Sequence, residues 1–428
     1  MIHFFKKNKL LLGVILIALI ERLVILFQLG FRYSINSEDI LYLESGIHLM
    51  KTGELTLNGM PSTIMPALPV IIALPHTIFG STDGLWLFLK LVMIAFSILS
   101  IIGVYKIIIL FSPKWIGALA ALLFLTPDFI WIDNLILTDS PFMFAFVYTV
   151  YFSIMLQKTH EWKYYYLLTA TYMFGLLLRS TFLIYPLILL AFLFFTNFPV
   201  KLLLKQAIIT SIICLLFFIP WTLRNYLIFD HFIPTSFESA SSKLLGTYQG
   251  YGFPEDTKKI NKELELQLKE LRTTHYKNGK YIPSYMGAYY AMKYDNLKAN
   301  YRNTLWIKSN PKSMLISYGY SKPKTIMTSS FSEKKLLGIN KLLIQKFKKI
   351  ELIMTISLGF ISMFFLKNIR KYILFMASLY IVNVYLYAIP INFQYSGQSL
   401  LFLRYTILFI SIYNIYLYIK EKKTKQVK

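Results

Sequence analysis

Apolar runs close to the length of a bilayer crossing recur along this chain, and they constrain its fold more than any other feature. A helix needs about 20 residues to cross the hydrocarbon core. Because unpaired backbone groups are costly in lipid, a crossing segment must be a helix or part of a closed barrel. We therefore predict an all-α polytopic membrane protein of about ten spans, at residues 10–29, 85–110, 116–132, 142–156, 164–178, 182–196, 207–221, 350–366, 372–389 and 400–419.

Basic residues gather in the short segments between these runs. The formal net charge is +24, although only 15% of the residues are charged. In a soluble protein this balance would suggest nucleic acid as the partner. Here the lysines flank apolar spans, the pattern that fixes orientation in a membrane. We expect a multi-pass protein of the cell (inner) membrane, in contact with membrane lipids, with both termini cytoplasmic and no nucleic-acid partner.

Polar stretches divide the chain into three parts. Residues 1–223 form an N-terminal transmembrane module with the candidate catalytic residues and a first outer loop at 30–80. Residues 224–349 contain no long apolar run and form an extracytoplasmic polar segment. Residues 350–428 hold the last spans and a basic cytoplasmic tail. Three helices are expected outside the spans: one that ends at Gly53 in the outer loop, an amphipathic one at 255–272, and a lysine-rich interfacial one at 334–349.

Two adjacent acids, Glu38 and Asp39, follow the first span directly. Carboxylates are expensive to keep near lipid, so an acid pair at this position suggests function. The pair can accept a proton or hold a cation; the alternative is a helix cap at the membrane surface.

Further polar residues punctuate the outer ends of later spans. Asp139 precedes a span and is either a site residue or, with Thr138, a helix cap. Arg179 lies in a short turn between two apolar runs, where a cation needs an anionic partner or water. The histidines show no metal-ligand spacing, and no glycine-rich nucleotide loop occurs in the sequence.

The order of these motifs resembles that of GT-C glycosyltransferases of the dolichyl-phosphate-mannose protein mannosyltransferase and aminoarabinose transferase type. The resemblance rests on Glu38-Asp39-Ile40-Leu41-Tyr42, Thr52-Gly53, Pro66-Ala67-Leu68-Pro69, Thr138-Asp139-Ser140-Pro141, Gly175-Leu176-Leu177-Leu178-Arg179, Pro220-Trp221-Thr222-Leu223-Arg224-Asn225-Tyr226 and Arg404-Tyr405. It covers nearly the whole chain as a pattern. The acid pair reads Glu-Asp where the family usually has Asp first, which leaves open which acid is the base.

The resemblance implies a GT-C-like bundle that moves a sugar from a polyprenyl-phosphate donor to a lipid, glycan or protein acceptor on the outer side, with inversion. A carboxylate must take the acceptor proton, and cations must stabilise the leaving phosphate. The implied catalytic residues are Asp39, Glu38 and Asp139, and the implied substrate-binding residues are Tyr42, Arg179, Arg224, Asn225, Arg404 and Tyr405. The resemblance implies no metal or other cofactor, although a divalent cation between the acids is conceivable.

Two other functions fit a protein of many spans. The first is an O-antigen-type glycan polymerase or ligase, whose working arginines lie mainly in large outer loops. The second is a transporter or flippase for a lipid-linked sugar. A transporter predicts paired halves and charges at mid-bilayer depth on broken helices, whereas the halves of this chain do not match.

Overall fold

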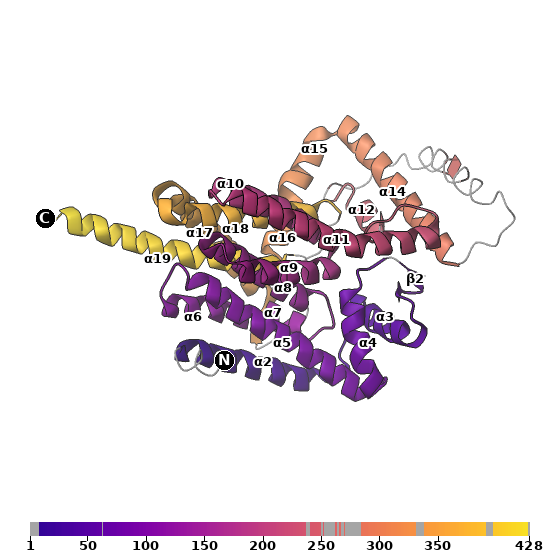
Figure 1. Cartoon of the computed structure of the whole chain (residues 1–428). Helices are drawn as coiled ribbons and strands as arrows, with labels where there is room; N and C mark the ends of the chain where they lie inside the picture. The colour runs from indigo at the N-terminus through magenta and orange to yellow at the C-terminus, as the bar shows by residue number, and fades with distance from the viewer. Residues whose placement is uncertain are drawn as a thin grey trace.

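The protein is a bundle of helices with very little sheet (Figure 1). The structure is a computed structural model that describes residues 8–61, 63–236, 240–249, 284–330, 338–390 and 397–426, with a few single residues between 251 and 269. The predicted amphipathic helix at 255–272 lies almost entirely outside the described residues. A two-stranded antiparallel ribbon pairs β1 (Thr56–Leu57) with β2 (Met60–Pro61).

The helices follow one another through short turns. The N-terminal part contains α2 (Lys9–Leu29), α3 (Glu38–Thr52), α4 (Ala67–Phe79), α5 (Asp83–Ile108), α6 (Lys114–Leu122), η1 (Leu123–Leu125), α7 (Pro127–Asp133), α8 (Asp139–Thr159), α9 (Trp162–Leu178), η2 (Ser180–Ile184), α10 (Tyr185–Phe195) and α11 (Val200–Phe229). The rest contains α12 (Ala240–Leu245), α14 (Ser284–Ser309), α15 (Pro311–Ile316), η3 (Ser317–Ser321), α16 (Lys322–Thr328), α17 (Lys341–Phe365), α18 (Lys367–Ala388), η5 (Gln398–Leu400) and α19 (Leu401–Gln426).

The ten predicted spans all fall on helical segments, but the third is broken and the helices differ in length. Six in the described part of the chain are long and apolar enough to cross a membrane: α2, α5, α8, α11, α18 and α19 together with η5. The fold class is confirmed as an all-α membrane bundle. α9 has 17 residues and η2 with α10 forms a shorter apolar segment. The lysines and Glu351 in the first half of α17 make that helix less apolar than an ordinary span.

The third predicted span, at 116–132, is not continuous. The chain bends by 68° between residues 114–125 and α7, so this segment is a broken span or a re-entrant loop. The bend falls at Thr126, whose backbone is extended, and Pro127 opens the next helix. A residue before proline is pushed out of the helical region, and proline suits a first helical turn.

The predicted interfacial helix at 334–349 is wrong as a separate element. Residues 341–365 form one continuous helix, α17, and Lys348 in it is buried at 4% exposure. The expected division at 349/350 therefore falls inside α17. The division at 223/224 likewise falls inside α11.

In the first outer loop the expected helix that ends at Gly53 is present as α3, and a second short helix, α4, follows it. α3 ends at Gly53, whose φ of +75° lies in the left-handed region that glycine adopts without strain. α4 packs closely on α3, because a Cβ atom at Gly46 would lie 2.4 Å from Cβ of Ile72. The absence of a side chain at Gly46 thus sets the distance between the two helices.

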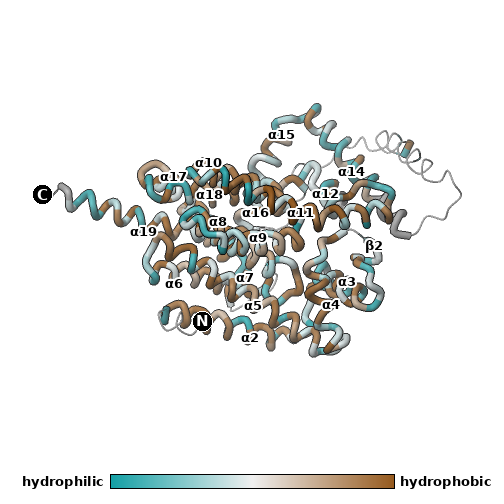
Figure 2. The backbone as a smooth tube through the Cα atoms, in the orientation of Figure 1, coloured by the Kyte–Doolittle hydropathy of each residue, from teal (hydrophilic) through white to brown (hydrophobic). Residues whose placement is uncertain are grey.

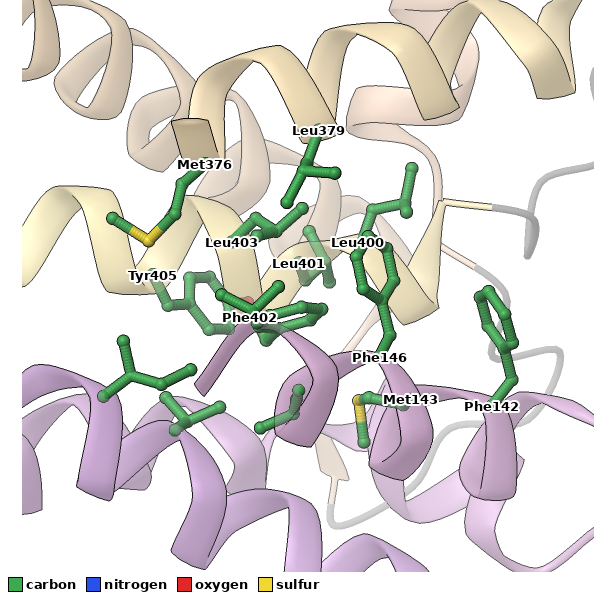
Figure 3. Packing of buried hydrophobic residues seen from close by; sticks show 14 of the residues in the cluster. Phe142, Met143, Phe146, Met376, Leu379, Leu400, Leu401, Phe402, Leu403 and Tyr405 are labelled. Atoms are coloured by element: carbon green, nitrogen blue, oxygen red, sulfur yellow. The ribbon is translucent and has the colours of Figure 1, made fainter. Parts of the chain in front are cut away.

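The core of the bundle joins its N-terminal and C-terminal parts. Figure 3 shows Phe142, Met143 and Phe146 of α8 facing residues of η5, α18 and α19. The rings of Phe146 and Phe402 meet edge to face, with centroids 5.1 Å apart. Figure 2 shows apolar residues along α2, α5 and α11 and polar residues toward the end of α19. The apolar outer face of α11, with Leu216 at 71% exposure, is one that lipid would cover.

The helix directions give the bundle two chemically different ends. The first turns of α3 and α8 lie at the same end as the last turn of α9, and this end carries acids and arginines. The opposite end carries the lysine-rich turns. Lys158, near the end of α8, lies 4.3 Å from the ring centroid of Phe111. Two ends of this kind agree with the charge asymmetry that orients membrane proteins.

Candidate active site

The acid pair lies at the start of α3, and its two members have different surroundings. Asp39 is buried at 2% exposure, and its carboxylate accepts backbone N–H groups from Ile35 at 3.1 Å and Ser37 at 3.2 Å. Asp39 thus fastens the loop that enters the helix. It does not cap α3, because no side-chain cap hydrogen bond is made at that helix start. Glu38 is exposed at the surface of the same helix end.

Tyr42, one turn further along α3, connects the acid pair to the rest of the site. Its phenol forms a side-chain hydrogen bond with Thr138 and is a charge neighbour of Glu38, Arg179 and Asp139. Burial, followed by the charge of Glu38, raises the pKa of the Tyr42 phenol above its ordinary value, so this group stays neutral and polar. Three separate parts of the chain therefore meet at one phenol.

Asp139 and Arg179 form an ion pair at the centre of this region. Nη2 of Arg179 lies 2.9 Å from Oδ2 of Asp139, with the arginine side chain 17% exposed and the aspartate 4%. The guanidinium also donates to Thr138 at 3.0 Å and to the hydroxyl of Tyr387 at 3.4 Å. Its carbon lies 5.0 Å from the ring centroid of Phe142, in cation–π geometry.

The chain is built to hold this arginine at the end of α9. A Cβ atom at Gly175, one turn before Arg179, would lie 2.7 Å from the ring of Phe182, so only glycine lets η2 fold this closely against α9. Burial by itself lowers the pKa of Arg179, but the neighbouring Asp139 and Tyr387 raise it above its ordinary value. The guanidinium is therefore a permanent cation.

One oxygen of Asp139 is unused. Oδ1 is buried and has no hydrogen-bond partner among the described residues. Asp139 and Thr138 do not cap α8, because no side-chain cap hydrogen bond is made at that helix start. The capping interpretation is thus wrong here. A buried carboxylate oxygen without a donor is costly in a folded protein unless a ligand supplies one.

Arg224 and Asn225 lie near the end of α11, and Arg224 contacts the first outer loop. Arg224 stacks 5.2 Å from the ring centroid of Trp221 and donates to the backbone carbonyl of Leu55 at 3.1 Å. Asn225 is fully buried, accepts from Arg224 at 3.0 Å, and donates to the carbonyl of Ile233 at 2.9 Å. This pair therefore lies beside the ribbon that follows α3.

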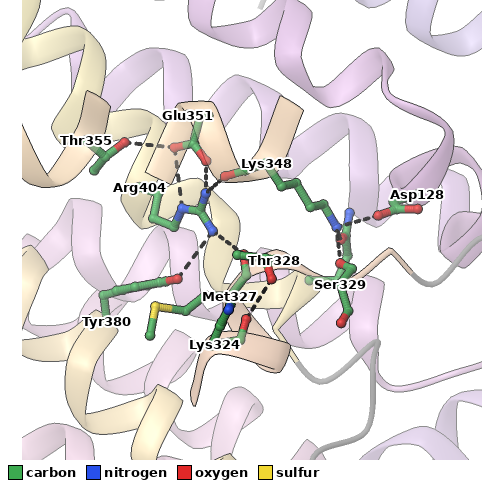
Figure 4. Close-up of polar contacts among 11 residues, drawn as sticks. Asp128, Lys324, Met327, Thr328, Ser329, Lys348, Glu351, Thr355, Tyr380 and Arg404 are labelled. Atoms are coloured by element: carbon green, nitrogen blue, oxygen red, sulfur yellow. Dashed lines mark hydrogen bonds and ion pairs between the residues drawn. The ribbon is translucent and has the colours of Figure 1, made fainter. Parts of the chain in front are cut away.

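Arg404 and Tyr405 belong to a different cluster. Figure 4 shows the Arg404 guanidinium against Glu351, with further bonds to the backbone of Lys348 at 2.8 Å and of Met327 at 2.6 Å. Tyr405 is buried and packs edge to face on Phe124 and Phe129. Within the described ranges, Arg404 and Arg179 share no hydrogen-bond or ion-pair partner.

Several charged residues near these clusters were missed in the sequence. Lys90 of α5 is buried at 1% exposure, donates to carbonyls of Tyr33 at 2.8 Å and of Asn134, and is a charge neighbour of Asp39. Arg22, by contrast, is conspicuous in the sequence as a charge inside the first span, with two interpretations: extension to the membrane surface or a role near the site. The first is wrong, because Arg22 is buried with Nε 2.8 Å from Asp133. The available signal was a charge inside an apolar run, which is rare unless it has a partner.

The arrangement can perform one kind of chemistry well. An exposed carboxylate, a buried carboxylate with an open oxygen, and an arginine lie together at one end of a membrane bundle. A carboxylate can accept a proton from a hydroxyl, and a guanidinium can bind a phosphate through parallel N–H bonds. No group of three or more metal-ligating side chains occurs in the part of the chain that the structure describes.

Comparison with solved structures defines the fold. The archaeal oligosaccharyltransferase AglB from Archaeoglobus fulgidus, solved with an inhibitory peptide and a dolichol-phosphate, matches over 98% of this chain with a TM-score of 0.53 and 14% identity. Its apo form matches over 99% with a TM-score of 0.57 and 15% identity. The chain spans about half of that protein, 52% in both cases. ArnT from Cupriavidus metallidurans, bound to undecaprenyl phosphate, matches over 94% of this chain and 77% of its own with a TM-score of 0.41 and 13% identity. The protein has the GT-C fold of membrane glycosyltransferases.

Sequence comparison narrows the relationship. Residues 62–223 match the family model described as dolichyl-phosphate-mannose-protein mannosyltransferase. That range holds Asp139 and Arg179 and supports the resemblance for this part of the chain; the motifs at 38–42, 224–226 and 404–405 lie outside it. No curated protein sequence matches the chain.

Proposed function

We propose that this protein is an integral membrane glycosyltransferase that moves a sugar from a polyprenyl-phosphate donor to an acceptor hydroxyl on the outer side of the cell membrane, with inversion. The observation that carries the proposal is the meeting of Tyr42, Asp139 and Arg179, with one carboxylate oxygen left open. The GT-C fold and the family match over residues 62–223 support it. The AglB structure held a dolichol-phosphate, a ligand of the proposed donor class.

Glu38 is the proposed general base. Its carboxylate is exposed at the end of α3 beside Tyr42, where an acceptor hydroxyl can reach it. The oxygens of Asp39 already accept two backbone N–H groups, so Asp39 is the proposed positioning residue that fixes the loop before Glu38. In a single displacement the base takes the acceptor proton while the new bond forms opposite the leaving phosphate.

The remaining residues divide the work of binding. Asp139 offers its open Oδ1 to a sugar hydroxyl, and Arg179 neutralises the leaving phosphate while it holds Asp139 in place. Arg224, half-buried on the ring of Trp221, is the proposed second cation for the lipid phosphate. Transfer without a resident metal or cofactor is part of the proposal. The lysine-rich end of the bundle, with both termini, is placed on the cytoplasmic side.

The test uses a strain that lacks the gene, because the sugar and acceptor can then be read from the cell envelope. Mass spectrometry should show a glycolipid or glycoprotein that loses one sugar, and the wild-type gene should restore it. Glu38→Gln should lower restored transfer by about 10²-fold or more at equal expression, because the base is lost. Asp39→Asn is the matched control. It should lower thermal stability and transfer together, through the loosened loop.

Three outcomes contradict the proposal. If the Glu38→Gln variant restores sugar transfer fully, Glu38 is not the general base. Loss of long glycan chains with the first sugar intact supports a polymerase or ligase. In membranes purified from the restored strain, loss of transfer in excess EDTA would show that a divalent cation is required.

A further inference from the structure

A cavity of about 390 Å³ lies between α9, α10 and α11, away from the acid pair. Leucine is the commonest residue of its wall, as at Leu168, Leu189, Leu193 and Leu203. This volume falls within the range of small-molecule sites, about 300–1,000 Å³. An apolar space of this size in a membrane protein can receive a hydrocarbon chain.

The cavity opens on the outer surface of the bundle. Two of its lining residues, Leu190 on α10 and Leu215 on α11, are 37% and 52% exposed. Only 11% of the apolar window of α11 is buried within the protein, so this helix faces the surroundings along most of its length. A lipid can therefore enter from the side, between α10 and α11.

One end of the cavity carries a polar group with nothing to bind. Gln206 lines the cavity and is buried at 3% exposure, and neither its amide nitrogen nor its amide oxygen has a hydrogen-bond partner among the described residues. Beside it, the hydroxyl of Tyr165 donates to the backbone carbonyl of Gln206 at 3.0 Å and lies 3.0 Å from Oγ1 of Thr210. An unsatisfied buried amide costs about 1–3 kcal/mol, so the site is complete only with a ligand that carries a hydrogen-bonding group.

Cations surround this polar end. Lys201 and Lys205, in the first turns of α11, and Lys163 in the first turn of α9 are exposed. Lys205 lies 5.3 Å from the ring centroid of Trp162, a pairing typical of a membrane–water interface. The neighbouring turn contributes one acid, Glu161. Basic groups at this depth attract anionic lipid headgroups by about 1 kcal/mol each.

The cavity is separate from the candidate active site. Gln206 and Trp221 are both on α11, about 22 Å apart at a rise of 1.5 Å per residue. Trp221 stacks with Arg224 at the acidic end, whereas Gln206 lies at the lysine-rich end. A donor phosphate held by Arg179 or Arg224 therefore cannot occupy the polar end of this cavity.

We propose that an anionic phospholipid of the leaflet at the lysine-rich end places one acyl chain in this cavity. Its ester carbonyl accepts from the Gln206 amide, and its phosphate lies between Lys201 and Lys205. The apolar wall suits the acyl chain, the unpaired amide suits the ester carbonyl, and the flanking lysines suit the phosphate. The site binds a lipid of the membrane itself, independently of sugar transfer.

The test is native mass spectrometry of the full-length, delipidated protein titrated with phosphatidylglycerol or phosphatidylcholine. The wild type should retain one phosphatidylglycerol at least tenfold more tightly than phosphatidylcholine. Ala207→Trp fills the cavity and should weaken retention of phosphatidylglycerol at least tenfold. Ile208→Trp, the next residue, which is 59% exposed and outside the cavity, is the matched control and should bind as the wild type does.

Two further variants separate the parts of the proposal. Gln206→Leu keeps the side-chain volume and should weaken phosphatidylglycerol and phosphatidylcholine alike; it also serves if Ala207→Trp does not fold. Lys201→Glu with Lys205→Glu should abolish the preference between the two lipids. Equal binding by the Ala207→Trp and Ile208→Trp variants would overturn the proposal. So would undecaprenyl phosphate that displaces phosphatidylglycerol one for one, since the cavity would then hold the donor's tail.

Discussion

Two clusters of charge in this protein each contain an arginine paired with an acid, but they differ in how completely their polar groups are hydrogen-bonded. In the first, Arg179 pairs with Asp139, and an oxygen of that carboxylate has no partner among the described residues. In the second, Arg404 bonds to both oxygens of Glu351, to two backbone carbonyls and to Tyr380 (Figure 4). The difference teaches that a charged group with all its hydrogen bonds made holds helices together, whereas one with an unpaired oxygen can bind a ligand.

Among the described residues, the acid Asp128 in the second cluster also has partners for both its oxygens, unlike Asp139 in the first. Asp128 accepts from Ser330 at 2.6 Å and pairs with Lys348, which also donates to the Ser329 carbonyl at 2.9 Å and to Gln398 at 3.1 Å. These bonds join α7 to α17 and to η5. The substrate-binding role expected for Arg404 and Tyr405 stays a prediction, and the contacts of Arg404 favour a structural role.

The largest expected effect is on turnover, and it distinguishes Asp139 in the first cluster from Asp128 in the second. Asp139→Asn should lower turnover per folded molecule by about 10²-fold or more, because it removes a charge aimed at the transition state. Its thermal midpoint should fall less than that of Asp128→Asn, because the Arg179 side chain is 17% exposed and that of Lys348 only 5%. Asp128→Asn should do the opposite, because it leaves Lys348 buried without its anion. Turnover of purified protein in nanodiscs and differential scanning fluorimetry measure the two. Equal changes in turnover and thermal midpoint for the two variants would show that the two clusters do not differ in function.

The second effect concerns stability alone. Arg404→Met should cost about 3–5 kcal/mol, because it leaves the buried Glu351 carboxylate uncompensated. The double variant Glu351→Met with Arg404→Met should recover most of that loss, since a well-packed apolar pair can replace a buried ion pair. Unfolding of the purified protein in a denaturant series measures both. If instead Arg404 binds the donor, the double variant will be stable but inactive.

The smallest effect comes from a matched pair of tyrosines. Tyr387 accepts from Arg179 and Tyr380 from Arg404, each at 3.4 Å. Tyr387→Phe should raise the KM for donor a few-fold with little change in stability. Tyr380→Phe should cost about 0.5–1.5 kcal/mol of stability and leave the KM unchanged. Steady-state kinetics with thermal unfolding of both variants checks this. A kinetic effect of Tyr380→Phe would show that the second cluster also contacts substrate.

The sequence predicted the elements of the fold better than their joins. Apolar length located the helices that became α2, α5, α8 and α11, and Gly53 located the end of α3. The bend between residues 114–125 and α7 was available from Thr126-Pro127, but continuous hydrophobicity concealed it. The length of an apolar run thus predicts a helix well, whereas a break inside such a run is predicted only by individual residues such as proline.

The candidate site shows the same limit. Asp139 and Arg179 were expected near the same side of the membrane, yet their pairing follows only from the antiparallel packing of α8 and α9. Lys90, Asp128 and Glu351 were overlooked, because each lies inside an apolar segment and its partners come from distant parts of the chain. Asp128 and Lys348 are 220 residues apart. Sequence spacing carries no information about such a contact.

The short helix α7 has a consequence for how this protein is made. Asp133 near its end binds Arg22 from the first helix, and Asp128 near its start binds Lys348 from a late one. During synthesis the first bond can form early, but Asp128 must wait until most of the polypeptide has emerged. A nascent or truncated molecule that stops before Lys348 exposes an acid where the finished protein has an ion pair. The contact between Asp128 and Lys348 therefore forms only when all but the last helices have been synthesised.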